Sequence, residues 1–143
     1  MVQRVLALML CLLMSHFALA RNVALLIAVG QFRDPQLKTM QLLGPAIDID
    51  SVQQTLISGW QFAPADVIAL RDQEATHERI LREISALQER TSPGDTVLIY
   101  FSGHGTSANA DGNSFDLPYA TGAWIPYDLN SDSLETAQRT FDF

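Results

Sequence analysis

The run Asn22–Val29 (NVALLIAV) is almost entirely apolar and ends at Gly30. Its apolar residues are not interrupted by alternating polar ones, which is typical of a strand buried on both faces of a parallel sheet. Two shorter apolar runs, Val67–Leu70 and Thr96–Phe101, follow at intervals that leave room for a helix. We therefore expect three buried strands, with helices covering both faces of the sheet they form.

The two segments between these runs carry helical patterns. The first helix is expected from Pro45, which suits a first turn, to Gly59, which ends the pattern. Its apolar positions are Ala46, Ile47, Val52 and Leu56. The second is expected from the N-cap Thr76 to about Arg90. Its apolar stripe is Ile80, Leu81, Ile84 and Leu87. The alternation of strands and helices predicts right-handed crossovers and an α/β fold with a parallel sheet.

The predicted sheet is small for a domain of this type. Sheets usually have about four to six strands, and the chain of 143 residues is long enough for a single domain. Residues 102–123 are rich in Gly, Ser, Ala, Asn and Asp and predict a long loop, and Trp124–Tyr127 predicts one more short extended piece. We expect residues 21–143 to be the N-terminal portion of a domain whose sheet is incomplete at its C-terminal side.

The first twenty residues have the pattern of a secretory signal peptide. Met1–Arg4 carries one positive charge, Val5–Met14 is apolar, and Ala18-Leu19-Ala20 provides small residues for cleavage after Ala20. We expect an exported protein, periplasmic or secreted, without a stable membrane anchor; an uncleaved signal anchor is the alternative. Cleavage would also remove Cys11, the only cysteine in the sequence.

Charge and glycine spacing argue against two classes of ligand. The formal net charge is −7 and there is no Lys/Arg cluster, so binding of nucleic acid through its phosphates is not expected. Val29-Gly30-Gln31 does not continue as a G-x-G-x-x-G loop, which argues against a dinucleotide site.

A histidine lies where a sheet of this kind places its active site. Parallel sheets bind ligands beyond the carboxyl ends of their strands, and the segment Ser102-Gly103-His104-Gly105 follows the third predicted strand. Histidine can transfer a proton near neutral pH. Flanking glycines let a substrate backbone approach and allow the N–H of Gly105 to point toward a developing oxyanion. Position alone leaves open a loop histidine whose glycines serve only turn geometry.

The segment Asp95–Gly105 (DTVLIYFSGHG) resembles the histidine strand of caspase-like cysteine peptidases, the metacaspase and bacterial orthocaspase group of peptidase C14. Further stretches resemble that family in the same order along the chain. They are Asn22–Gly30, Leu42–Asp48 (LLGPAID), Ala75-Thr76, Asp111-Gly112 and Ile125–Asp128 (IPYD). The match covers about residues 22–128. It implies a caspase-like three-layer α/β/α fold with a mostly parallel sheet, and a protein or peptide as substrate.

The resemblance also implies roles for site residues. His104 would be the catalytic acid and base, and the backbone N–H of Gly105 would bind the oxyanion. The family's nucleophile is a cysteine in a D-x-C pattern after a fourth strand, and no such pattern occurs here. We therefore expect a cysteine-type endopeptidase by resemblance, of which this chain alone is inactive. The alternative is a non-catalytic caspase-like module that binds a peptide or protein.

The resemblance relates substrate preference to two positions near the start of the first predicted helix. Asp-directed caspases carry an arginine where this chain has Leu42, whereas metacaspases use acidic residues to bind Arg or Lys before the scissile bond. Asp48 matches one such substrate-binding position, but Asp-directed caspases also carry an aspartate there, so Leu42 is the better evidence against a preference for Asp. The alternative for Asp48 is a carboxylate in the first helical turn that complements the helix dipole.

No cofactor is expected, with calcium as the one candidate, because some metacaspases are activated by it. Oxygen ligands suit calcium, and the acidic residues concerned are Asp111, Asp116, Asp128 and Asp132. Their spacing matches no EF-hand loop, so a solvated acidic loop is the favoured interpretation and no metal ligand is assigned. The oligomeric state is left open.

Overall fold

The computed structural model describes residues 20–106 and 123–130. Within them, three parallel strands form the central sheet in the order β2-β1-β3. The strands are β1 (Asn22–Ala28), β2 (Val67–Arg71) and β3 (Thr96–Ser102). The three predicted strands and their parallel arrangement are confirmed.

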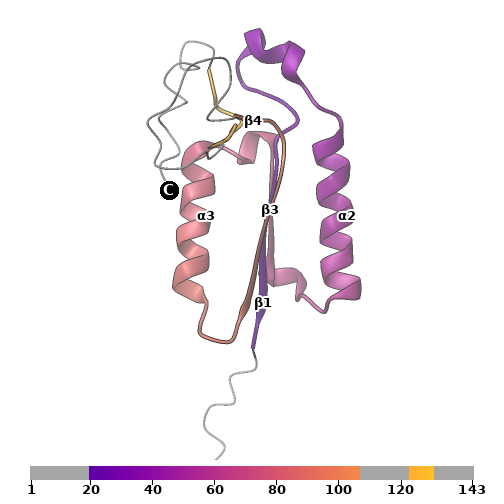
Figure 1. The fold of residues 1–143 in the computed structure, drawn as a ribbon, viewed down its shortest axis with the longest axis vertical. Coiled ribbons are helices and arrows are strands. Elements are labelled where there is room, and N and C mark those ends of the chain that lie inside the picture. Colours follow the sequence, from indigo (N-terminus) through magenta and orange to yellow (C-terminus); the bar gives the residue numbers. More distant parts are fainter. Residues whose placement is uncertain (1–19, 107–122, 131–143) are drawn as a thin grey trace, which may run out of the picture.

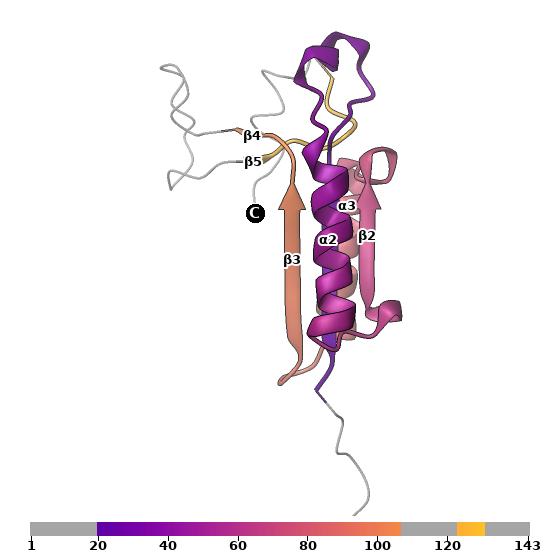
Figure 2. The ribbon, with the colours of Figure 1, turned by 90° about the vertical axis from the view of Figure 1, so that its right-hand side faces the viewer.

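Two helices cover opposite faces of the sheet (Figure 1). They are α2 (Gly44–Gly59) and α3 (His77–Arg90). Short 3₁₀ turns complete the connections: η1 (Pro35–Met40), η2 (Pro64–Asp66) and η3 (Asp72–Glu74). The fold is therefore the predicted three-layer α/β/α arrangement, seen with α2 in front of the sheet in Figure 2.

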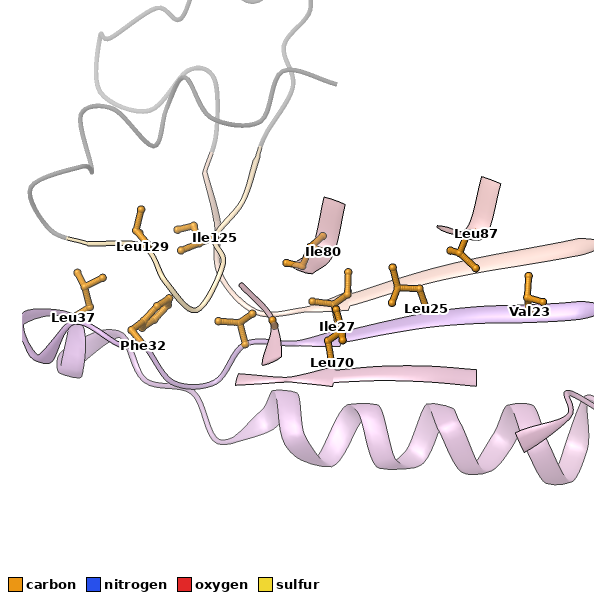
Figure 3. Close-up of a cluster of buried hydrophobic side chains, with 12 residues drawn as sticks. Val23, Leu25, Ile27, Phe32, Leu37, Leu70, Ile80, Leu87, Ile125 and Leu129 are labelled. Atoms are coloured by element: carbon orange, nitrogen blue, oxygen red, sulfur yellow. The ribbon is translucent and has the colours of Figure 1, made fainter. Parts of the chain in front are cut away.

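Strand β1 is the centre of both halves of the core. Successive side chains of a strand point to opposite faces. Val23, Leu25 and Ile27 pack with Ile80 and Leu87 of α3 (Figure 3). The intervening Ala24, Leu26 and Ala28 pack with Ile49 and Leu56 of α2. All of these β1 side chains are at most 1% exposed, which explains why the run contains no polar alternation.

The face that α2 buries agrees with the predicted one at Val52 and Leu56 but not at Ala46 and Ile47. Ile47 is 66% exposed, and Ala46 is exposed as well. Leu56 is buried as predicted, with Val52 partly buried against the same cluster, and the buried residues of the helix are Pro45, Ile49 and Leu56. They share one face because their spacing of four and then seven residues follows the helical repeat, and Ile47 cannot point to the sheet once Ile49 does.

Strand β3 is not the buried strand that its sequence predicts. Val97 is 46% exposed and Ile99 is 42% exposed. In the described part of the chain β3 pairs with β1 alone, so its other edge faces outward. A groove of about 370 Å³ lies between this edge and α2, lined by Ser51, Val52, Thr55, Leu56, Trp60, Leu98, Ile99 and Tyr100. Within residues 20–106 and 123–130, the sheet is therefore incomplete at this edge, as predicted.

A short antiparallel pair lies beyond the carboxyl end of β3. It consists of β4 (Gly105–Thr106) and β5 (Ala123–Trp124). The residues after β5 run back across this end of the sheet, where Ile125 and Leu129 join the core on the α3 side (Figure 3). The extended segment predicted at Trp124–Tyr127 corresponds to β5 and these residues.

The predicted signal peptide lies almost entirely outside the described residues, as do 107–122 and 131–143. The cleavage after Ala20 and the domain boundaries therefore stay predictions. Across the described ranges no helix has the length and apolar character that crossing a bilayer requires.

Candidate active site

The candidate site lies where the connections of the sheet change direction. The chain leaves β1 toward β2 on one side, and β3 lies on the other side of β1. Open parallel sheets bind ligands at such a switch point, beyond the carboxyl ends of the two strands from which the chain leaves in opposite directions. Here those ends belong to β1 and β3, and the N–H of Val29 donates to the carbonyl of Ser102 at 2.9 Å. The loops that begin at Gly30 and at Gly103 therefore start side by side.

The ring of His104 is fixed by a backbone contact. Its Nε2 lies 2.8 Å from the carbonyl oxygen of Met40, at the end of η1. A carbonyl oxygen can only accept a hydrogen bond, so Nε2 carries the proton and, in the neutral ring, Nδ1 carries the lone pair. The ring of Phe32 lies nearby, with 6.3 Å between ring centroids. The geometry thus leaves Nδ1 as the basic atom of His104.

Close packing accounts for the glycine before His104. A Cβ atom on Gly103 would lie 2.9 Å from Cζ of Phe101 and 3.1 Å from the carbonyl oxygen of Val29. Both contacts are shorter than ordinary van der Waals contact. A larger residue at position 103 would push the His104 loop away from the end of β1.

The backbone N–H of Gly105 points away from β5. Gly105 lies opposite Trp124 in the antiparallel pair, and the N–H of Ile125 donates to the carbonyl of His104 at 3.0 Å. In antiparallel strands, residues flanked in this way form a non-hydrogen-bonded pair, whose own N–H groups face outward. Gly105 is exposed, so a group outside the β4–β5 pair can approach its N–H.

Asp48 and Ser102 form a polar pair at the same end of the sheet. The hydroxyl of Ser102 donates to Oδ2 of Asp48 at 2.7 Å. No acidic residue lies in the first turn of α2, so the interpretation of Asp48 as a first-turn carboxylate is wrong. The sequence analysis assigns no site role to Ser102. Its place at the end of the strand, two residues before His104, could have indicated one.

The acidic residues considered for calcium do not form a site in the described chain. Oδ1 of Asp128 accepts a hydrogen bond from the N–H of His77 at 2.8 Å and so caps the start of α3. Asp111, Asp116 and Asp132 lie outside the described residues. Within residues 20–106 and 123–130, no group of three or more His, Cys, Asp or Glu side chains is arranged to hold a metal ion.

Comparison with known proteins agrees with this architecture. The family model described as the caspase domain matches residues 21–138. A curated relative, Metacaspase-1 of Scheffersomyces stipitis, is 29% identical over an alignment of 100 residues that covers 65% of this chain and 24% of the relative. The chain therefore spans about a quarter of that relative's length. Because the family match covers most of the chain, and the fold and the resemblance of its histidine strand agree with it, the chain belongs to the caspase-domain family, peptidase C14.

Proposed function

We propose that this chain contributes the histidine half of a cysteine endopeptidase site, with His104 as the catalytic acid and base. The observation that carries the proposal is the hydrogen bond between Nε2 of His104 and the carbonyl of Met40. It supports the role because it holds the ring at the carboxyl edge of the sheet and keeps Nδ1 as the proton acceptor. Family membership supports a proteolytic reaction on protein or peptide substrates.

The proposed reaction begins when Nδ1 of His104 takes the proton of a cysteine thiol. The thiolate sulfur attacks the scissile carbonyl carbon, and the carbonyl electron pair moves to oxygen, where the N–H of Gly105 stabilises the charge. The carbon–nitrogen bond then breaks, and His104 returns its proton to the leaving amine. Water, deprotonated by the same ring, hydrolyses the thioester and restores the thiol.

The thiol has to come from outside residues 21–143. The only cysteine of the sequence is Cys11, in the expected signal peptide. Thiolate chemistry requires a thiol, so we expect the 143-residue chain alone to cleave no peptide. In an active protein, further sequence or a partner chain would bring the cysteine to the carboxyl edge of the sheet beside His104.

Asp48 is the proposed binding residue for the side chain before the scissile bond. Its carboxylate is oriented by the hydroxyl of Ser102, and a carboxylate in this position would pair with Arg or Lys of the substrate. Leu42 supplies no positive charge for an acidic side chain. The proposed preference is therefore for cleavage after basic residues.

Export after cleavage at Ala20 is part of the same proposal. N-terminal sequencing of the protein recovered from outside the cytoplasm should begin at Arg21. A recovered protein that still begins at Met1 would contradict it.

The catalytic assignment is tested in a protein that contains this chain together with the cysteine-bearing sequence. His104→Ala should lower kcat by about 10²–10⁴-fold on a peptide with Arg before the cut, because proton transfer is lost. His77→Gln, which changes the only other histidine of residues 21–143, is the matched control and should keep its rate. Undiminished turnover by His104→Ala would refute the assignment.

A non-catalytic, peptide-binding role is the second candidate, and the absence of a thiol in residues 21–143 favours it. The DNA that follows the Phe143 codon separates the two. A further strand ending in D-x-C supports the peptidase. Its absence in every reading frame, together with binding of an Arg-containing peptide without cleavage, supports the binding module.

A further inference from the structure

Asp72 occupies an unusual backbone conformation at the end of β2. Its φ angle is +42°, a region that residues other than glycine seldom adopt, with Asp and Asn among the exceptions. Its Oδ1 accepts hydrogen bonds from the N–H groups of Gly30 at 2.8 Å and of Gln31 at 2.9 Å. The side chain of Asp72 therefore holds the loop that leaves the neighbouring strand β1.

This loop continues to the ring of His104. The carbonyl of Gly30 accepts a hydrogen bond from the N–H of Leu42 at 2.8 Å. That bond fixes the chain just after Met40, whose carbonyl binds Nε2 of His104. Gly30 and Leu42 are in close contact, because a Cβ atom on Gly30 would lie only 2.5 Å from the carbonyl oxygen of Leu42.

The backbone of Asp72 leads to the other side of His104. Its carbonyl accepts a hydrogen bond from the N–H of Ala75 at 2.8 Å, and the carbonyl of Ala75 accepts one from Tyr127 at 3.0 Å. Two residues before Tyr127, the N–H of Ile125 donates to the carbonyl of His104 at 3.0 Å. Ala75 is fully buried, so this second connection runs through the core.

We propose that Asp72 is a positioning residue for His104. Its side chain binds the loop at Gly30 and Gln31, which continues to the Met40 carbonyl that binds the imidazole ring. Its backbone binds Ala75, which in turn binds the segment that is hydrogen-bonded to the backbone of His104. Asp72 makes both contacts from the end of β2, which lies on the far side of β1 from β3. The catalytic significance of this arrangement rests on the proposed function, whereas the positioning itself is a property of the folded chain.

Two substitutions separate positioning from folding. Asp72→Gly removes the acceptor oxygens, and glycine tolerates a positive φ, so the backbone is not strained. Asp72→Asn keeps an acceptor oxygen, and asparagine also tolerates this region. Asp50→Ala is the matched control, because it removes an exposed carboxylate whose ion pair is with Arg71, at 2.8 Å, and not with either loop.

The readouts are the tautomer of His104 and the exchange of individual backbone amides. Both are measured by NMR on the full ¹⁵N-labelled chain at about pH 8, where a histidine side chain is normally neutral. The unsubstituted chain should show the Nε2–H tautomer. Asp72→Gly should give a mixture of tautomers and speed amide exchange at Leu42 by roughly 10- to 100-fold, given the usual strength of hydrogen bonds to a charged acceptor.

Exchange at Leu25, in the middle of β1, should not change in Asp72→Gly, and both Asp72→Asn and Asp50→Ala should behave as the unsubstituted chain does. An unchanged tautomer in Asp72→Gly would overturn the proposal, and so would an Asp72→Asn chain that behaves as Asp72→Gly does. Faster exchange throughout β1 would make Asp72 a general determinant of the fold, and the proposal would again be wrong. None of these readouts uses peptidase activity, so a failure of the proposed function is seen separately in the His104→Ala assay.

Discussion

Replacing Gly30 by alanine tests how tightly the two loops of the candidate site are packed. The added Cβ would lie 2.5 Å from the carbonyl oxygen of Leu42, against 3.4 Å for ordinary contact. The neighbour is backbone, so it cannot turn away as a side chain does. One of the two segments has to move by about 0.9 Å to restore an ordinary contact distance.

This movement acts on a hydrogen bond. The N–H of Leu42 donates to the carbonyl of Gly30 at 2.8 Å, and a displacement of that size along the bond lengthens it to about 3.7 Å, beyond hydrogen-bond distance. Overpacking costs about 1–3 kcal/mol, and a lost hydrogen bond about 1 kcal/mol more. We therefore expect Gly30→Ala to lower the free energy of unfolding by about 2–4 kcal/mol.

Thermal unfolding followed by circular dichroism measures the effect. A loss of 2 kcal/mol lowers Tm by at least about 8 °C in a domain of this size. Gly59→Ala is the matched control, because a Cβ at this last residue of α2 meets nothing within 4 Å. Alanine favours a helix over glycine, so the control should raise stability by up to about 1 kcal/mol. If Gly30→Ala unfolds within 2 °C of the unsubstituted chain, the close contact is not real and the reasoning fails.

Two further predictions concern carboxylates that accept backbone hydrogen bonds. Asp128→Ala should lower the free energy of unfolding by about 1 kcal/mol in a urea titration, because the N–H of His77 loses its acceptor at the start of α3. Asp128→Asn keeps an acceptor oxygen and should recover most of the lost stability. Equal losses in both variants would contradict the capping role. The N–H groups of Arg21 and Ser92 donate to Asp95 and hold the pKa of that carboxyl below its ordinary value. The folded chain therefore keeps Asp95 charged where the unfolded chain takes up a proton, so its contribution to stability is complete above about pH 5 and is lost as the pH falls through the lower, folded-state pKa. Asp95→Asn should flatten the stability of the chain between about pH 5 and pH 3, and an unaltered slope would refute this origin.

Local sequence patterns predicted where the strands and helices lie, but not which of their residues are buried. The apolar run at the start of the fold predicted β1 because every residue of a central strand faces a helix. The run Thr96–Phe101 has the same character, yet Val97 and Ile99 are exposed. Whether a strand has a neighbour on each side is decided by the rest of the sheet, and no pattern within the strand reports it. In α2, the choice between Ile47 and Ile49 was likewise decided by how the helix rotates onto the sheet.

The position of His104 was predictable from the sequence, whereas its contacts were not. A residue that follows a parallel strand lies at the carboxyl edge of the sheet wherever that strand is placed. The partner of its ring, Met40, is 64 residues earlier in the chain. Asp48 and Ser102 are separated by 54 residues. These pairs depend on the path of the loop after β1, which periodicity does not encode. The roles of His104 and Gly105 in catalysis and of Asp48 in substrate binding stay predictions.

The support of His104 comes from the middle of the sheet and not from its own strand. In the described part of the chain β3 is hydrogen-bonded on one side only, and exposed edges of a structure open more readily than its centre. The ring and the backbone of His104 are instead bound by Met40 and Ile125. Backbone hydrogen bonds connect these segments to the ends of β1 and β2, from Leu42 to Gly30 and from Tyr127 to Ala75. A shift of the outer edge of β3 is therefore opposed at two points beyond its end. It follows that Asp72→Gly, two strands away, should disturb the tautomer of His104 more than Val97→Ala on its own strand.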